Sequence, residues 1–250
     1  MPIEERVADG VATVVIDRPP VNALTLADLA ALTGCFRRYA ERPEVRVAVL
    51  CAAGRGFVGG GDIKEVAALP GHDGILGQAN GSFEASMAIY DCAVPVIAAV
   101  GGYCIGLGVI LAASADLIVA AVGTRFVFPE VGNGAAACGA AHASTLLPDK
   151  RVRQAMYTGE PVDVAEMAAY GGIAAVVPEA ELATTAARLA ATIAAKPPAV
   201  VRQAKASLNA VSRLDLADRY RTELGYLYQL NLAGGAQAAR ADFLRRHESV

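Results

Sequence analysis

The hydrophobic residues of this chain fall into short apolar runs separated by longer stretches with helical spacing. The run VATVVIDRP, from Val11 to Pro19, alternates and then becomes continuously apolar, which is typical of a strand. The next stretch, residues 25–42, repeats apolar residues on one broad face and predicts an amphipathic helix. Thr25 is its expected N-cap, and Asp28 supplies an acidic group to its first turn.

The same two patterns continue along the chain. Further strands are predicted at 45–53, 94–100, 115–122 and 124–131, because these segments are short and largely apolar. A glycine-rich turn at 54–61 leads into a helix start. After a polar, glycine-containing segment at 70–81, we expect a helix at 83–93, a buried helix at 106–116, and a helical pattern from about residue 149 almost to the end.

This order of elements predicts an α/β protein in which helices cover sheets. Two glycine loops, at 54–61 and 101–108, each follow a strand and precede a helix. Such a loop points backbone N–H groups into a crevice, where they can hold an anion or a developing oxyanion. Neither loop matches a nucleotide-binding fingerprint, because GLGVIL lacks the third glycine of the dinucleotide motif and GGGDIK lacks the lysine pattern of a phosphate loop.

One uncharged stretch, Cys92 to Ala115, is long enough to span a bilayer. Pro95 and four glycines divide it into short parts, and Asp116 follows at once. We therefore expect a fully buried strand and a buried helix here, and no membrane segment.

Composition narrows the class of protein further. The 250 residues carry a net charge of −3 and contain no basic block, so nucleic acid is not an expected partner. The five cysteines stand singly, which is typical of buried thiols in a reducing compartment. The charged start MPIEERVADG does not resemble a signal peptide, so we expect a cytoplasmic protein. The three histidines share no metal-ligand spacing, and no metal is expected.

Glu130 is the candidate for chemistry. It is the only charged residue in the fifteen-residue segment FVFPEVGNGAAACGA, from Phe126 to Ala140. A burial-prone segment usually excludes a glutamate unless something requires it. A carboxyl group in a dry apolar pocket has its pKa raised toward neutrality, which suits proton transfer near pH 7.

Five motifs in the same order resemble the crotonase superfamily, also called the enoyl-CoA hydratase/isomerase family. These motifs are RPPVNAL (18–24), GRGFVGGGDIKEV (54–66), VPVIAAVGGYCIGLG (94–108), SADLIVAAVGTRFVFPEV (114–131) and YTGEPVDVAEMAAYGGIAAVVP (157–178). The resemblance covers nearly the whole chain. It implies a spiral of ββα units over residues 1–190 and a helical, trimer-forming region over 191–250. Homotrimers or hexamers are expected.

The resemblance also implies a ligand and a site. The substrate is expected to be an acyl-CoA thioester, with CoA as part of the substrate and no separate cofactor. The backbone N–H groups of Gly59 and Leu107 are expected to hold the thioester oxygen as it becomes an enolate, with Glu130 as acid and base. Residues expected to line the substrate channel are Asn22, Ala23, Leu24, Gly61, Asp62, Ile63 and Ile110.

The sequence departs from the family pattern at one position that matters. Typical hydratases of this family use two glutamates, and here the helix position is Ile110, so Glu130 stands alone. Adding water to a double bond calls for two groups to manage that water. Plain hydration is therefore less expected than double-bond isomerisation, in which one base moves one proton. A catalytically silent CoA-binding protein is a further alternative.

A third chemistry is also compatible with these residues. Parts of the chain, including FPEVGNGAAACGAAH, resemble an actinobacterial subset linked to sterol ring opening. Such enzymes hydrolyse a carbon–carbon bond in a cyclic β-diketone CoA thioester. Under this interpretation His142 shares proton transfers with Glu130; the alternative is that His142 is a structural residue of a helical turn.

Overall fold

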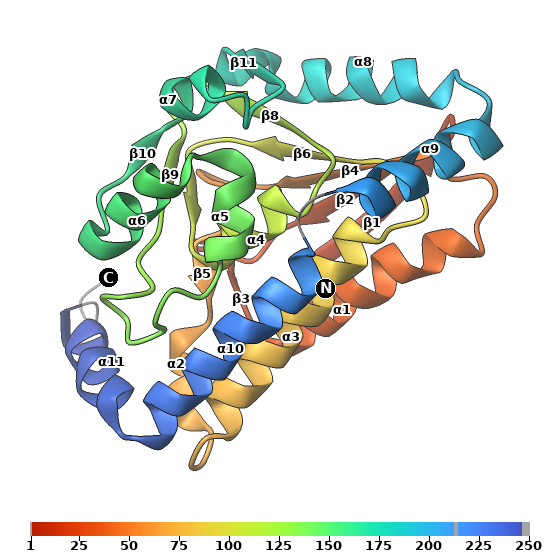
Figure 1. The fold of residues 1–250 in the computed structure, drawn as a ribbon. Coiled ribbons are helices and arrows are strands. Elements are labelled where there is room, and N and C mark those ends of the chain that lie inside the picture. Colours follow the sequence, from red (N-terminus) through yellow and green to blue (C-terminus); the bar gives the residue numbers. More distant parts are fainter. Residues whose placement is uncertain (1, 213–214, 247–250) are drawn as a thin grey trace.

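The computed structural model describes residues 2–212 and 215–246. Its largest sheet has six strands in the order β1-β2-β4-β6-β8-β11 (Figure 1). The bounds of these strands are β1 Ile3–Ala8, β2 Val11–Ile16, β4 Val47–Ala52, β6 Val96–Val100, β8 Leu117–Ala121 and β11 Ala175–Val177. β1 pairs antiparallel with β2, and every other neighbouring pair is parallel.

Two small sheets lie beside the large one. Their strands are β3 Ala23–Leu24 and β5 Gly60–Gly61 in one, and β7 Tyr103–Ile105, β9 Arg125–Val127 and β10 Val162–Asp163 in the other. The α-helices are α1 Leu26–Arg37, α2 Ile63–Ala68, α3 Asp73–Tyr90, α4 Leu107–Ala113, α5 Ala140–Leu146, α6 Asp149–Thr158, α7 Val164–Ala169, α8 Leu182–Ala194, α9 Pro198–Val211, α10 Leu216–Leu232 and α11 Gly235–Arg246. Two short 3₁₀ turns lie at Arg38–Ala40 and Glu179–Glu181.

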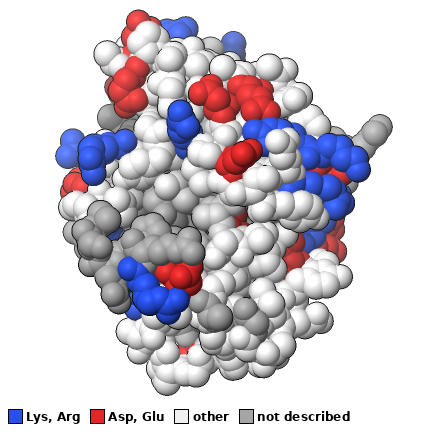
Figure 2. Space-filling view, turned by 90° about the vertical axis from the view of Figure 1, so that its left-hand side faces the viewer, with Lys and Arg blue, Asp and Glu red and all other residues white. Residues whose placement is uncertain are grey.

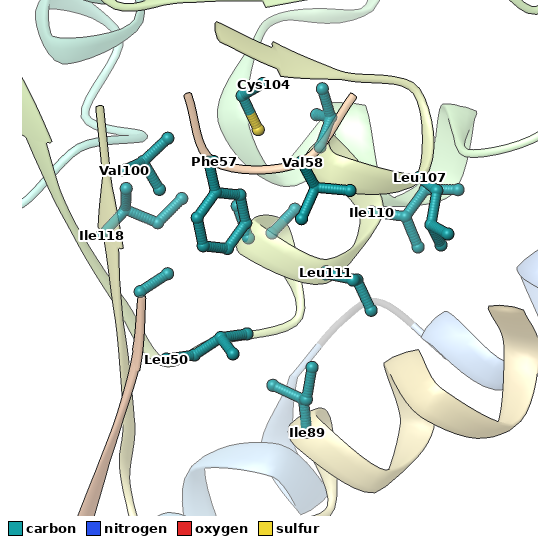
Figure 3. Close-up of a cluster of buried hydrophobic side chains, with 14 of the residues drawn as sticks. Leu50, Phe57, Val58, Ile89, Val100, Cys104, Leu107, Ile110, Leu111 and Ile118 are labelled. Carbon is teal, nitrogen blue, oxygen red and sulfur yellow. The ribbon is translucent and has the colours of Figure 1, made fainter. Parts of the chain in front are cut away.

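The central strands β4, β6 and β8 of the large sheet are buried on both faces, which explains why they are nearly continuous apolar runs. On β4, Val47 and Val49 face α8, whereas Ala48 and Leu50 face the main core. Figure 1 shows α8 over one face of this sheet and α1, α3 and α10 on the other side. In the main core, Leu50 packs in a cluster with side chains of β6, α3 and α4 (Figure 3). This is the α/β arrangement that the pattern predicted.

The start of α1 also agrees with its sequence. The Thr25 hydroxyl accepts a hydrogen bond from the Asp28 amide at 3.2 Å, and the Asp28 carboxylate accepts one from the Thr25 amide at 2.9 Å. This reciprocal pair is a capping box, which satisfies two amides that lack helical partners.

The helix predicted at 83–93 begins earlier than expected, within the polar, glycine-containing segment 70–81. Helix α3 begins at Asp73 and runs through Gly74, Gly77 and Gly81. A Cβ atom on Gly77 would lie 2.9 Å from Leu26 Cδ1, and one on Gly81 would lie 3.0 Å from Leu29 Cδ1. The glycines therefore permit close packing of α3 on α1, and tertiary contact outweighs their low helix propensity.

Other differences concern short strands. The charged N-terminal segment forms β1, in which Ile3, Glu5 and Val7 are half-buried and the residues between them are exposed. β10 and β11 interrupt the region after residue 149 that was predicted to be helical. Their two or three residues carry too little pattern to be recognised.

The apolar stretch 92–115 is divided among β6, β7 and α4. Over the described residues, no helix has the length and apolar character needed to cross a membrane. Acidic and basic side chains are interspersed on the face drawn in Figure 2. The division at residue 190 and the trimer-forming role of the C-terminal helices stay predictions.

Candidate active site

A cavity of about 1180 Å³ lies where the two glycine loops, the Glu130 turn and the C-terminal helices meet. The predicted residues that line it are Ala23, Gly59, Gly61, Asp62, Ile63, Leu107, Ile110 and Glu130. Most of the lining is apolar, as expected for a pocket that holds an organic ligand. Thus segments separated by more than a hundred residues along the chain contribute to one site.

Glu130 is held in a tight turn after β9. Its carbonyl accepts hydrogen bonds from the amides of Ala135 at 2.8 Å and Asn133 at 3.2 Å, which fix the backbone. The side chain is buried, and Oε2 has no hydrogen-bond partner. Burial raises the pKa of Glu130 to about 8, with a smaller contribution from the charge of Glu223. A carboxyl group in this state can exchange a proton near neutral pH.

The second glycine loop delivers α4 to the cavity. Gly106 has a φ of +53°, a conformation that favours glycine, and its amide donates to the Val127 carbonyl at 2.9 Å. Leu107 is the first residue of α4, so its amide has no partner within the helix. Figure 3 shows Leu107 and Ile110 side by side at one end of the buried cluster.

Gly59, in the first glycine loop, does not have the role that was expected from the sequence. The amide of Gly59 donates to the Val21 carbonyl at 2.9 Å. A residue has a single backbone N–H, so this bond contradicts the expected role of Gly59 as an oxyanion donor. A Cβ atom on Gly59 would lie 2.6 Å from the same Val21 oxygen, so the glycine is explained by close backbone packing.

Two residues expected in the substrate channel lie outside the cavity lining. Asn22 is buried, and its Nδ2 donates to the carbonyl of Ala53 at 2.8 Å and to those of Gly56 and Phe57 at 3.1 Å. It therefore ties the chain before β3 to the loop after β4. Leu24 is fully buried in the main core.

Arg18 lies at the cavity with its charge already paired. Its guanidinium lies 3.0 Å from the Asp28 carboxylate and 3.2 Å from the Asp62 carboxylate. Asp62 also caps α2 by accepting the amide of Glu65 at 3.1 Å. Of the two carboxylates among the described lining residues, only Glu130 is therefore free of an ion pair.

His142 is fully buried on α5 and does not line the cavity. Its ring packs edge-on against the ring of Tyr220, with centroids 4.8 Å apart at 83°. Neither ring nitrogen has a hydrogen-bond partner, and burial lowers the pKa of His142 to about 3. The imidazole is therefore neutral at physiological pH. A direct part for His142 in proton transfer stays a prediction.

Three residues missed by the sequence analysis belong to this region. Tyr220 and Cys138 line the cavity, and the Cys138 sulfur lies 3.7 Å from the Tyr220 hydroxyl. Glu223 is bonded to the segment that follows Cys138. Tyr220, Glu223 and Leu227 follow helical spacing, which is a detectable pattern, but nothing in the sequence shows which segment this helix contacts.

The described residues contain no group of three or more His, Cys, Asp or Glu side chains arranged to bind a metal ion. The cavity is compatible with binding a large, mostly apolar ligand beside one ionisable carboxyl group. Stabilising a developing negative charge would fall to backbone amides such as that of Leu107.

Comparison with known proteins gives the family. The enoyl-CoA hydratase/isomerase family matches residues 6–248. A "(7aS)-7a-methyl-1,5-dioxo-2,3,5,6,7,7a-hexahydro-1H-indene-carboxyl-CoA hydrolase" of Rhodococcus jostii is 39% identical over 236 residues, covering 94% of this chain and 91% of that protein. A Mycobacterium tuberculosis protein of the same name is 38% identical over 247 residues, covering 98% of this chain and all of that protein.

A solved structure supports the same conclusion. The probable enoyl-CoA hydratase of Mycobacterium thermoresistibile superposes with a TM-score of 0.81 at 30% identity, covering 95% of this chain and 98% of that one. The expected crotonase fold is thus confirmed over nearly the whole chain. The chain belongs to the enoyl-CoA hydratase/isomerase family and is an enzyme of the crotonase type.

Proposed function

We propose that this enzyme is a hydrolase that breaks a carbon–carbon bond in a cyclic β-diketone carried as a CoA thioester. The observation that carries the proposal is the single unpaired carboxyl group of Glu130, which lines the cavity together with Ile110. A hydratase would call for a second group to manage water. The Rhodococcus and Mycobacterium relatives, whose names describe hydrolases of a dioxo-indene-carboxyl-CoA, support the same reaction class.

The reaction can be written with one acid–base group. Glu130 in its ionised form removes a proton from water, and the hydroxide adds to the ring ketone β to the thioester. The bond between that carbon and the thioester α-carbon then breaks. Its electron pair moves into the thioester as an enolate, and the proton on Glu130 is delivered to the α-carbon. The product is a ring-opened carboxylic acid that retains its CoA thioester.

The enolate oxygen requires a donor in the transition state. We assign this role to the amide of Leu107, supported by the Gly60–Gly61 corner that lines the same cavity. Such a donor typically contributes about 10²–10³ in rate. His142 is assigned to packing behind Tyr220. We further propose that the enzyme needs no separate cofactor and acts as a trimer or hexamer in the cytoplasm.

A direct test uses the CoA thioester of 2,6-dioxocyclohexanecarboxylic acid, a cyclic β-diketone, in water labelled with oxygen-18. Mass spectrometry is expected to show the gain of one water and one labelled oxygen in the new carboxyl group. Glu130→Gln is expected to abolish this product while the thioester still binds. Isomerisation of a 3-enoyl-CoA without any ring opening would instead favour the isomerase alternative. Thioester binding without any turnover would favour the catalytically silent one.

A further inference from the structure

Helix α10 fastens the segment that leads from the Glu130 turn into α5. The two carboxylate oxygens of Glu223 accept hydrogen bonds from the amides of Gly139, at 2.7 Å, and Ala141, at 2.5 Å. One turn earlier, the Tyr220 hydroxyl meets the Cys138 sulfur at 3.7 Å. Residues three apart lie on one face of a helix, so this face of α10 holds residues 138–141 at successive points.

Glu223 is connected to the cavity wall through Gly139. Gly139 has a φ of +93°, and a Cβ atom on it would lie only 3.0 Å from Ile110 Cγ1. Its backbone is therefore pressed against Ile110, which lines the cavity together with Cys138 and Tyr220. Glu223 itself does not line the cavity.

We propose that Glu223 is a positioning residue of this site: it holds Gly139 and Ala141 so that Ile110, Cys138 and Tyr220 form a fixed wall, and its negative charge acts on Glu130. The consequence for turnover rests on the proposed function, because the wall shapes the space in which the ring is opened. The effect on Glu130 does not depend on which substrate the enzyme uses.

Burial raises the pKa of Glu130 to about 8 and that of Glu223 to about 7, so both carboxyl groups titrate near neutral pH. The uncharged groups around them do not. Burial raises the pKa of Cys138 to about 12 and that of Tyr220 well above its usual range, and it lowers that of His142 to about 3. Helix α4 carries no titratable side chain, and α3 contacts Tyr220 through Phe83. Arg219 on α10 favours the ionised form of Glu223. The cations among the described lining residues are Arg18, which is paired with Asp28 and Asp62, Lys64 on α2 and Arg240 on α11.

The variant Glu223→Gln distinguishes this proposal from a purely structural role of Glu223. The variant keeps the side-chain shape and one acceptor but loses the charge. Its matched control is Asp218→Asn, which removes a charge from the exposed face of the same helix. Titration of Glu130 is followed by infrared difference spectroscopy without substrate, with the carboxyl band assigned by Glu130→Gln. Affinity is measured with butyryl-CoA, and kcat and KM with the cyclic thioester.

The expected result has two parts. Glu223→Gln lowers the midpoint of the Glu130 titration by at least about half a pH unit, because a like charge is removed. It also lowers kcat at least about tenfold with little change in butyryl-CoA affinity, because the wall is displaced. Asp218→Asn changes neither quantity.

Glu223→Asp provides a second measurement, since it keeps the charge but draws the carboxylate back from both amides. We expect an unchanged Glu130 midpoint and a reduced kcat.

An unchanged midpoint in a folded Glu223→Gln overturns the electrostatic part, and an unchanged kcat in Glu223→Asp overturns the positioning part. If Glu223→Gln does not fold, the kcat of Glu223→Asp decides whether Glu223 is a positioning residue. If the wild type does not open the ring, the infrared titration is still readable, so failure of the proposed function is distinguishable.

Discussion

The Oε1 atom of Glu130 lies 3.2 Å from the position that a Cβ atom would occupy on Gly106. The carboxyl group of Glu130 thus lies directly against Gly106, the N-cap residue of α4, and Leu107, the first residue of that helix, follows in the chain. Under the proposed function, this proximity brings together the two parts that thioester enolate chemistry requires, a proton-transfer group and a backbone donor.

Glu130→Gln is expected to abolish turnover and to stabilise the folded protein in a pH-dependent way. The folded pKa of Glu130, about 8, exceeds its ordinary value, so the folded state holds the proton more tightly and wild-type stability falls as pH rises from about 4.5 to 8. The glutamine variant lacks this loss, and its advantage at pH 8 is at most on the order of 4 kcal/mol. Urea unfolding of both proteins at about pH 5 and pH 8 measures it. An equal difference at both pH values would contradict the burial of an ionisable Glu130.

The wild-type rate has a pH dependence of its own. If ionised Glu130 activates water, kcat/KM rises with pH and reaches a plateau above about pH 8, since this parameter reports the free enzyme. Initial rates across pH 6 to 10 test this expectation. A rate that falls over the same range would show that the protonated carboxyl is the required form.

Leu107→Pro is expected to lower kcat by about 10²–10³ without unfolding the protein. Leu107 is the first residue of α4, a position where proline fits because its missing N–H has no helical partner. Leu107→Ala is the matched control, since it shortens the side chain but keeps the amide, and its kcat is expected to stay within about tenfold of wild type. Circular dichroism verifies folding. Full activity in a folded proline variant would exclude this amide as the donor.

Ile110→Glu is expected to raise hydration of crotonyl-CoA from a very low wild-type rate. The substitution places a second carboxyl group in the lining of the cavity that holds Glu130, where it can help to position water. Loss of enoyl thioester absorbance follows the reaction, and Ile110→Gln controls for the change in shape. Fast hydration by the wild type would show that one glutamate suffices and would remove the argument against a hydratase.

His142→Phe is expected to retain ring-opening activity and to resist acid better than the wild type. The folded pKa of His142, about 3, lies below its ordinary value, so the unfolded chain binds a proton first and wild-type stability falls as pH drops below about 6.5. The phenylalanine ring keeps an edge toward Tyr220, and the expected advantage is about 2 kcal/mol at pH 5. Thermal unfolding at several pH values measures it. A hundredfold loss of kcat in a folded variant would show that His142 takes part in proton transfer.

Local pattern was sufficient for much of this protein. The apolar runs identified β2, β4, β6 and β8 because strands buried on both faces need apolar side chains throughout. The Thr25 cap was readable because its partner Asp28 lies three residues away. Glu130 stood out because an isolated charge in an apolar segment is costly unless it has a use. The family followed from five ordered motifs.

Only the tertiary structure decided how those residues are used. Gly59 matched the expected motif, but its amide is bonded to Val21, a contact between chain segments that no local pattern encodes. The glycines of the segment 70–81 did not indicate a helix, and only the close packing of Gly77 and Gly81 on α1 explains them. Glu223 lies 93 residues after Glu130, and its role depends on the docking of α10 on the segment before α5. Sequence periodicity records which face of an element is buried, whereas the partner of that face is set by the fold as a whole.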